Sequence, residues 1–430
     1  MFQTIRNVLH VKDIRNKILF TLAMLLVFRL GTFIPVPGVD ASALNAMDQG
    51  AFGIFNFFGG GALNNFSILA MGIMPYITAS IIVQLLQMDV IPKFAQWAKE
   101  GEVGRKKLAQ VTRYGTVVLG FMQAIGMGYG FNNMAGGMLV QNPNWGKYLL
   151  IALTLTAGTA FLMWLGEQIT SNGIGNGISI IIFGGIVAGL PTIFNQLYEM
   201  LIKNAGEQLY INIAIVAGIF LLVLALIVGI IFVQQAARKV PVQYAKRASS
   251  GGVGTTGAQN THLPIKINAA GVIPVIFASS FIMTPTTIAS FFDNPTSSWI
   301  AKNFTFTSWL GMSLYVVLII AFTYFYAFIQ VNPEKIAENL KKQGGYVPGI
   351  RPGKATFEYF SRVLSRLTFV GALFLATIAM LPVLLGKIFG LPDSIQIGGT
   401  GLLIVVGVAL DTLKQLEGQL VKRNYKGFIK

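Results

Sequence analysis

Ten apolar stretches of roughly membrane-spanning length constrain this chain more than any other feature of its sequence. A helix needs about 20 apolar residues to cross the hydrocarbon core of a bilayer. Such stretches cover residues 18–36, 70–88, 114–130, 148–166, 178–197, 209–233, 270–290, 309–330, 367–386 and 398–414. Hydrophobic residues make up 54% of the 430 residues and charged residues only 11%, too little charge to cover a water-facing surface. The sequence therefore predicts an all-α polytopic membrane protein with ten transmembrane helices.

Lysine and arginine alternate in density between successive connections. They are dense in the N-terminal segment, after the second span, between the sixth and seventh, between the eighth and ninth, and in the C-terminal tail. Basic residues concentrate on the cytoplasmic side of membrane proteins. The alternation predicts that both termini and these three connections lie in the cytoplasm.

Ten spans divide into five and five, and an odd number per half gives the two halves opposite orientations, as in inverted repeats. The predicted halves are residues 1–197 and 198–430. Gly72 stands three residues before Pro75 at the start of the second span, as Gly271 stands before Pro274 at the start of the seventh. Matching glycine and proline interruptions point to the working part of such proteins, although both residues are common in membrane helices.

Residues 51–67, with the sequence AFGIFNFFGGGALNNFS, fit neither a span nor an exposed loop. The stretch is apolar and aromatic, yet it is too short to cross and three consecutive glycines interrupt it. Irregular backbone at membrane depth is tolerated only where it is buried in protein or lines a cavity. Two interpretations remain, a re-entrant element inside the bundle and a loop at the outer membrane interface.

Groups for catalysis or coupled transport are scarce. The chain has no cysteine, which excludes disulfides, thiol nucleophiles and cysteine-based zinc sites. Arg29 is the one charge well inside a predicted span, and the sequence contains no phosphate-binding loop. The scarcity of buried carboxylates disfavours a secondary transporter of small solutes, and the lack of a catalytic set disfavours an intramembrane enzyme. We predict no enzymatic activity, no cofactor and no metal, and favour a passive conduit that takes its energy from elsewhere.

Two basic connections are long enough to dock a soluble partner. The connection between the sixth and seventh spans has a flexible glycine- and serine-rich tip at residues 249–257. The one between the eighth and ninth opens with residues 332–342, which predict a short amphipathic helix with Pro333 at its first position. Arg351 follows, between two Pro-Gly pairs that favour turns. A role in topology or lipid contact would explain the charges but not the turn chemistry, so we predict docking of a large partner.

Short motifs along essentially the whole chain resemble the SecY family, the channel subunits of the bacterial Sec protein translocon. They are FIPVPG at 33–38, MGIMPYITAS at 71–80, GEVGRKK at 101–107, MWLGEQIT at 163–170, GIGNGIS at 173–179, THLP at 261–264, GIRPG at 349–353 and GGT at 398–400. The resemblance implies a channel of two pseudo-symmetric halves in the bacterial cytoplasmic membrane. It also implies opening across the membrane for secreted chains, and sideways between the second and seventh spans for signal sequences and membrane helices.

The resemblance carries functional residues onto matching positions. An apolar pore ring falls on Ile73, Ile77, Ile178, Ile182, Ile276 and Ile404. A plug falls on about residues 54–66, including Phe55, Asn56, Phe57, Phe58, Gly59, Gly60 and Gly61. Lateral-gate candidates are the neutral polar residues Thr78, Gln84, Asn176, Asn268 and Thr284, for which ordinary hydrogen bonding between helices is the alternative. Docking candidates are Arg105, Lys106, Arg247, Lys341, Lys342, Arg351 and Lys354.

The resemblance also implies partners: SecE, SecG, the SecA ATPase, the ribosome, secretory preproteins with their signal sequences, and anionic lipids, but no specific nucleic-acid sequence. Counting residues from the outer ends of the second and seventh spans predicts that Thr78 and Thr284 lie at similar depth. A ring of branched apolar side chains is expected to exclude ions by dewetting while it deforms around a passing chain.

Overall fold

The computed structural model describes residues 11–40, 59–88, 90–203, 209–244, 260–289, 294–305, 308–389 and 393–426. Within these residues, ten helices overlap the ten predicted spans. They are α2 (Lys12–Gly31), α5 (Met74–Leu86), α7 (Glu102–Met134), α8 (Trp145–Asn172), α9 (Gly177–Tyr198), α10 (Leu209–Gln235), α11 (Ile273–Ala289), α13 (Trp309–Gln330), α15 (Lys354–Phe389) and α16 (Asp393–Lys426). Shorter helices are α6 (Pro92–Lys99), η1 (Glu199–Lys203), α12 (Pro295–Asn303) and α14 (Pro333–Lys342). The predicted all-α membrane class is confirmed.

Membrane-crossing character follows from length and apolarity. Among the described residues, five segments are each long and apolar enough to cross a bilayer: Trp145–Asn172, Gly177–Lys203, Leu209–Gln235, Trp309–Lys342 and Lys354–Lys387. The apolar helices α5 and α11 have only 13 and 17 residues, fewer than the roughly 20 that a crossing needs. A crossing at α5 or α11 therefore has to include non-helical backbone, which must be buried in protein.

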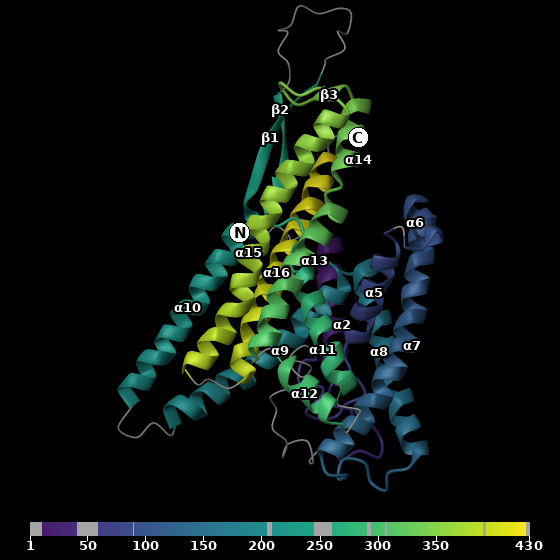
Figure 1. Cartoon of the computed structure of the whole chain (residues 1–430), viewed down its shortest axis with the longest axis vertical. Coiled ribbons are helices and arrows are strands. Elements are labelled where there is room, and N and C mark those ends of the chain that lie inside the picture. The colour runs from purple at the N-terminus through teal and green to yellow at the C-terminus, as the bar shows by residue number, and fades with distance from the viewer. Residues whose placement is uncertain are drawn as a thin grey trace, which may run out of the picture.

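Helices that follow one another in the sequence pack side by side (Figure 1). In the first half α5 lies against α7, α7 against α8 and α8 against α9; in the second, α11 lies against α13, α13 against α15 and α15 against α16. Two seams join these groups, where α5 contacts α11 and where α9 contacts α16. Helices α6 and α12, which follow α5 and α11, lie at opposite ends of the bundle, so α5 and α11 are antiparallel.

Three helices extend well past the predicted spans. They are α7, which begins at Glu102 rather than 114, α15, which begins at Lys354 rather than 367, and α16, which continues to Lys426 rather than 414. The extension of α15 has an amphipathic face, because Phe360, Val363 and Leu364 are buried while Arg362 is exposed. Outside the lipid a helix continues wherever it has such a face to bury, and apolar run length does not report this.

The connection between the sixth and seventh spans forms a β-hairpin rather than a plain loop. Strands β1 (Ala237–Tyr244) and β2 (Asn260–Lys266) pair antiparallel, with Val240 opposite Leu263. A third strand, β3 (Gly345–Tyr346), pairs with the other edge of β1 and gives the order β2-β1-β3. Val240 and Val242 point into one buried cluster with Leu340 of α14. The two predicted docking connections are therefore one folded unit.

The glycine–proline similarity between the halves extends to the backbone. Gly72 has φ +56° and Gly271 has φ +67°, a left-handed conformation that glycine adopts at little cost. In each half the helix begins two residues later, and its second residue is proline. In each half, the backbone carbonyl of the residue four positions before this glycine also lies against a glycine of another helix. An added Cβ on Gly158 of α8 would lie 1.9 Å from the Ile68 oxygen, and one on Gly371 of α15 would lie 2.9 Å from the Ile267 oxygen.

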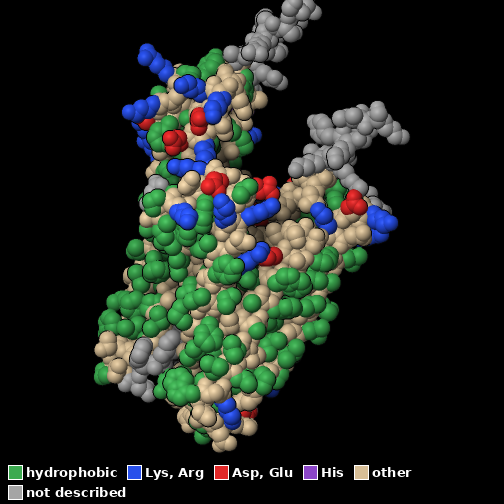
Figure 2. Space-filling model, turned by 90° about the vertical axis from the view of Figure 1, so that its right-hand side faces the viewer, with side chains coloured by type: hydrophobic (Ala, Val, Ile, Leu, Met, Phe, Trp, Pro, Cys, Tyr) green, Lys and Arg blue, Asp and Glu red, His purple; other side chains and the backbone are tan. Residues whose placement is uncertain are grey.

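Side-chain chemistry divides the surface of the molecule. Figure 2 shows hydrophobic side chains covering a broad band of one face, with lysine and arginine gathered toward the end that carries the hairpin. Exposed large apolar residues are frequent on the long helices, as on α10 with Phe220, Leu221 and Phe232. Patches of this extent are unusual on soluble monomers, and they fit a surface that faces lipid.

Candidate channel constriction, plug and gate

All six isoleucines of the expected pore ring lie in or against one buried cluster. Ile73, Ile77, Ile182, Ile276 and Ile404 belong to it, and the partly buried Ile178 packs against it. Ile73 caps the N-terminus of α5 and Ile77 lies within that helix; the others lie on α9, α11 and α16. These four helices all take part in the two seams between the halves, to which α7 adds a contact with α11. The ring candidates therefore meet where the halves meet.

The described part of the apolar connection before α5 is irregular and mainly buried. The N–H of Val36 donates to the carbonyl of Phe66 at 3.0 Å, and that of Ile68 donates to the carbonyl of Ile34 at 2.9 Å. Phe66 is fully buried and meets the Phe131 ring edge-on, with centroids 6.1 Å apart. For these residues the structure decides for an element inside the bundle and against an interfacial loop.

Of the plug candidates, Gly59, Gly60 and Gly61 fall within the described residues. Phe55, Asn56, Phe57 and Phe58 lie outside them. Gly59 and Gly60 are buried, and Ala62 belongs to the same apolar cluster as the ring isoleucines. The base of the expected plug and the expected ring thus share one packed core.

The gate candidates on α5 and α11 bond to their own helices. The Thr78 hydroxyl donates to the Met74 carbonyl at 3.1 Å, and the Thr284 hydroxyl donates to the Ser280 carbonyl at 2.9 Å. Membrane threonines commonly bond one turn back in this way. The contact between the two helices is made elsewhere, by the Ser280 hydroxyl and the Met74 sulfur at 3.9 Å.

The expectation that Thr78 and Thr284 lie at similar depth is wrong. Each threonine is one turn further along its own helix than the Met74–Ser280 contact, and the helices run in opposite directions. Two turns of separation amount to about 12 Å along the axis at 1.5 Å per residue. The sequence estimate failed because it took the outer ends of the two spans as level, whereas Met74, the first residue of α5, lies beside Ser280 in the middle of α11.

Gln84 makes a hydrogen bond that crosses between the halves. Its side-chain oxygen accepts from the hydroxyl of Tyr326 on α13, and its nitrogen donates to the Ser80 hydroxyl at 3.1 Å. The Tyr326 ring also packs edge-on against Phe277 of α11, with centroids 5.0 Å apart. Sequence reasoning missed Tyr326, because a tyrosine in an aromatic span gives no sign of which helix its hydroxyl will reach.

Asn176 and Asn268 stand at helix entrances. The Asn176 side chain accepts from the Ile178 N–H at 3.1 Å and so caps α9. Asn268 is buried before α11 and donates to the Gly271 carbonyl at 3.0 Å, while its side-chain oxygen has no protein partner. Both residues therefore fix chain turns next to helices that form the seams.

The docking candidates are exposed and fall on two protrusions. Arg105 and Lys106 lie at the start of α7; Lys341 and Lys342 end α14; Arg351 and Lys354 precede or begin α15; Arg247 lies outside the described residues. The predicted helix at residues 332–342 is confirmed, with Pro333 in its first turn. Lys342 bonds Glu338 at 2.8 Å. That hydrogen bond, and then the charge of Lys342, lowers the pKa of Glu338.

Arg351 sits between two tight turns, as its flanking Pro-Gly pairs predict. The N–H of Ile350 donates to the Val347 carbonyl at 3.0 Å across Pro348 and Gly349, and Gly349 has φ +82°. The Thr356 hydroxyl donates to the Arg351 carbonyl at 2.8 Å. The backbone is therefore fixed on both sides of an exposed arginine side chain.

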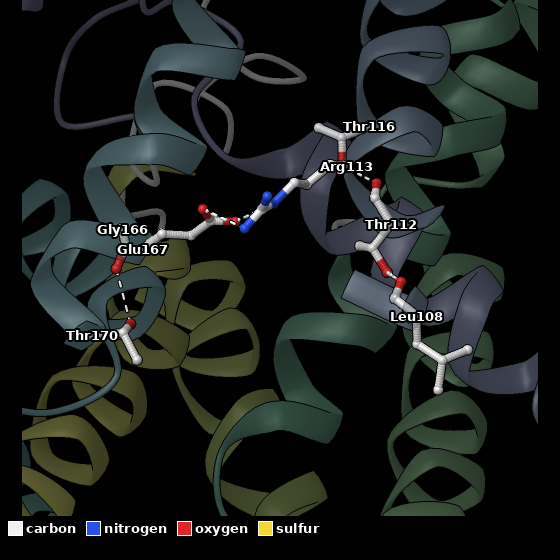
Figure 3. A network of polar contacts seen from close by, with 7 residues as sticks. All are labelled: Leu108, Thr112, Arg113, Thr116, Gly166, Glu167 and Thr170. Atoms are coloured by element: carbon white, nitrogen blue, oxygen red, sulfur yellow. Dashed lines mark hydrogen bonds and ion pairs between the residues drawn. The ribbon is translucent and has the colours of Figure 1, made fainter. Parts of the chain in front are cut away.

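An ion pair between α7 and α8 also escaped sequence reasoning. Arg113 Nε and Nη2 donate to the two carboxylate oxygens of Glu167 at 2.7 and 2.8 Å, and Figure 3 shows the side chains pointing toward each other. Thr112, Thr116 and Thr170 nearby bond to backbone carbonyls of their own helices. The sequence separation of 54 between Arg113 and Glu167 hides such a pair from local sequence patterns.

The fold and this arrangement define a polytopic α-helical membrane channel subunit built around a buried apolar cluster where its two halves meet. The family model for SecY matches residues 67–413. The chain is 66% identical to the protein translocase subunit SecY of Bacillus licheniformis and 63% identical to that of Bacillus subtilis, with 100% of each chain covered. This chain therefore belongs to the SecY family.

Solved structures share the fold. A protein conducting channel matches with TM-score 0.65 at 17% identity, covering 97% of this chain and 95% of that chain. A SecY protein, whose plug domain is described as stabilising the closed state and maintaining a membrane seal, matches with TM-score 0.65 at 19% identity and the same coverage. Sec61 from a canine ribosome-channel complex matches with TM-score 0.61 at 17% identity, again covering 97% and 95%.

Proposed function

We propose that this chain is the protein-conducting channel subunit of a bacterial Sec translocon. It passes secreted polypeptides across the cytoplasmic membrane and releases transmembrane segments sideways into lipid. One observation carries the proposal: six isoleucines meet in one buried cluster on the four helices that form both seams between the halves. A constriction at a seam widens when the halves part. Apolar branched side chains also exclude ions without demanding matched hydrogen bonds from the passing chain.

The remaining assignments follow from that centre. The halves are residues 1–197 and 198–430, the gate is the seam between α5 and α11, and the plug includes the buried base at Gly59 to Gly61. Family membership supports SecE, SecG, the SecA ATPase, the ribosome, preproteins with signal sequences and anionic lipids as partners. The basic, folded unit of β1, β2, β3 and α14 supports docking of SecA or the ribosome there. Its charge also supports a cytoplasmic location for this end and for both termini.

A translocation assay with a lockable gate tests the proposal. Since the chain has no cysteine, Met74→Cys and Ser280→Cys together give a single thiol pair at the α5–α11 contact. In vesicles that contain the chain with SecE and SecG, supplied with SecA and ATP, a secretory preprotein should become protected from protease. Linking the two thiols with a short bifunctional reagent should stop this transport, and a cleavable link should restore it after reduction.

Matched controls make the assay decisive. Each single-cysteine variant should transport after the same treatment. The pair Thr78→Cys and Thr284→Cys should form no direct disulfide on oxidation, because about 12 Å of axial separation exceeds the Cα spacing of a disulfide. Undiminished transport through a linked 74–280 pair would contradict lateral opening at this seam. Uptake of small solutes by vesicles that lack SecA would favour the transporter alternative.

The plug assignment has its own measurement. Deleting residues 57–61 should raise ion conductance in planar bilayers, because the base of the segment packs against the same core as the ring. A conductance equal to that of the unaltered channel would mean that the isoleucine ring seals without this segment.

A further inference from the structure

Arg29 is the one charged residue well inside the apolar stretch of α2. A cationic side chain at membrane depth is costly, and such residues usually bond to something in the protein interior. Helix α2 carries no other charge from Ile18 onward. No carboxylate among the described residues forms an ion pair with Arg29. Its charge therefore has to be accommodated by other means.

Among the described residues, two groups contact the guanidinium of Arg29. Its Nη1 donates to the backbone carbonyl of Gly60 at 2.5 Å, and its Cζ lies 4.8 Å from the centroid of the Phe33 ring. A hydrogen bond from an ionised donor is stronger than a neutral one, and an aromatic face attracts a cation further. The span's single charge is thus directed at the base of the expected plug.

Gly60 is confined from its other side as well. It has φ +66°, and an added Cβ would lie 3.0 Å from the Gly185 Cα on α9. The backbone of the segment therefore lies against α9 and within reach of the Arg29 side chain from α2. Ala62, two residues on, is fully buried in the cluster that contains the ring isoleucines. A shift of Gly60 would consequently expose Ala62 and disturb the packing beside the ring.

We propose that Arg29 is a positioning residue that anchors the plug base in the closed channel through the carbonyl of Gly60. This inference rests on the plug role given under Proposed function. The anchor acts on a backbone carbonyl, so it does not depend on which side chains the plug carries. The carbonyl is neutral, so its release leaves no carboxylate unpaired, and the freed guanidinium retains the Phe33 ring as a partner. The anchor is thus compatible with repeated opening.

A thiol-accessibility experiment tests the anchor without relying on transport. The reporter is Ala62→Cys in the full-length channel complex, labelled with a water-soluble maleimide added from outside. Combining it with Arg29→Gln should raise the labelling rate about tenfold. With Arg29→Lys the labelling rate should lie between those of the unaltered Arg29 and Arg29→Gln, because lysine keeps the charge on a single nitrogen. Arg15→Gln on the exposed face of the same helix removes an equal charge without touching the segment and should leave the rate unchanged.

Two further variants secure the result. Asn65→Cys, at an exposed position of the same segment, should label readily in every background and so reports that the reagent reaches the segment equally. Leu63→Cys, also buried, replaces Ala62→Cys if the latter disturbs assembly. An unchanged labelling rate with Arg29→Gln, or an equal rise with Arg15→Gln, would overturn the anchor.

Ion conductance separates this inference from the plug proposal. If Arg29→Gln raises both labelling and conductance, the anchor and the seal both stand. If labelling rises while conductance stays low, the anchor stands and the sealing role of the plug fails. If labelling stays constant while the deletion of residues 57–61 opens the channel, the seal stands and the anchor is overturned.

Discussion

Helices α5 and α11 begin in the same way, yet the chain reaches them from opposite ends of the molecule and from unlike structures. Each has a left-handed glycine, a proline as its second residue and an upstream carbonyl pressed against a glycine of another helix. Before α5 the chain is a buried irregular segment. Before α11 it comes directly from the edge strand of the basic hairpin.

The difference shows which parts of an inverted repeat keep one structure in both halves and which parts can differ. The shared glycine and carbonyl geometry sets two short helices into the seam, and inversion turns the upstream connections toward opposite ends. One connection can then bury apolar residues beside the constriction, while the other can form an exposed basic surface. The common part specifies the seam, and the variable part specifies what each end of the channel does.

The largest expected effect would break the equivalence of the two carbonyl contacts. Gly158→Ala places a Cβ 1.9 Å from the Ile68 carbonyl oxygen, whereas Gly371→Ala places one 2.9 Å from that of Ile267. We expect Gly158→Ala to lower the free energy of unfolding by about 3 kcal/mol or more through overpacking. Gly371→Ala should stay within about 1 kcal/mol of the original, because helix propensity gained by alanine offsets a smaller shift.

Denaturant titration of the purified proteins measures both variants. Gly146→Ala is the matched control, since it lies on the same helix as Gly158 with nothing within 4 Å of the added Cβ. Equal losses for Gly158→Ala and Gly371→Ala would show that the two contacts are energetically the same.

The second prediction concerns the basic end alone. Arg351→Glu should reduce SecA-driven translocation at least tenfold while leaving the free energy of unfolding unchanged, because the exposed side chain is presented by fixed turns and supports no packing. The measurement is preprotein protection in vesicles. Arg362→Glu, the same charge change at an exposed position of α15, is the control and should retain transport. Transport by Arg351→Glu at the original rate would mean that the charge of Arg351 serves only to set the orientation of the chain in the membrane.

The third prediction sharpens the similarity. Gly72→Ala and Gly271→Ala each force a Cβ into a left-handed backbone, which costs roughly 1–2 kcal/mol. The two losses should agree closely, since neither added Cβ would meet an atom nearer than 3.8 Å. Thermal unfolding of the two variants in one detergent provides the comparison. A much larger loss at Gly72 would mean that the buried segment before α5 adds a constraint that the hairpin side lacks.

The smallest expected effect contrasts the charges at the two ends. Because its folded-state pKa is lowered, the Glu338 carboxylate supports α14 at neutral pH, and this support is lost as the pH falls through the lowered pKa. The pair with Lys342 is exposed, so the change should be slight and screened by salt. Amide exchange of α14 should rise modestly in acid, and Glu338→Gln should remove that response. Ala62→Cys labelling, which reports on Arg29, should not follow this titration.

The sequence predicted the membrane helices well where lipid alone determines them. The eighth predicted span, 309–330, has the bounds of α13, and the sixth begins with α10 at Leu209. A helix that leaves the lipid follows other rules, so the extension of α15 along Phe360 and Leu364 was missed. Strand β3 was missed because Tyr346 pairs with Gln243, which belongs to a different connection, and local patterns do not report such a partner.

The site was predictable only through resemblance. Isoleucine is ordinary in any membrane span, so nothing local distinguishes Ile77 or Ile404 from lipid-facing neighbours. Arg29 was visible as an unusual charge, but its partner is a backbone carbonyl that carries no sequence signal. Polar pairs such as Gln84 with Tyr326 depend on which helices are adjacent, and only the folded structure gives this adjacency.

The hairpin also has a mechanical consequence. Strand β1 has eight residues, a length of about 26 Å at 3.3 Å per residue, and its base is closed by the bond from the Ile267 N–H to the Ala236 carbonyl at 3.0 Å. The third strand and the cluster beneath it stiffen this arm. Four residues past the base lies Gly271, whose turn before α11 is held by the bond from the Asn268 side chain to the Gly271 carbonyl at 3.0 Å. A force applied at the hairpin thus arrives at a seam helix as torque.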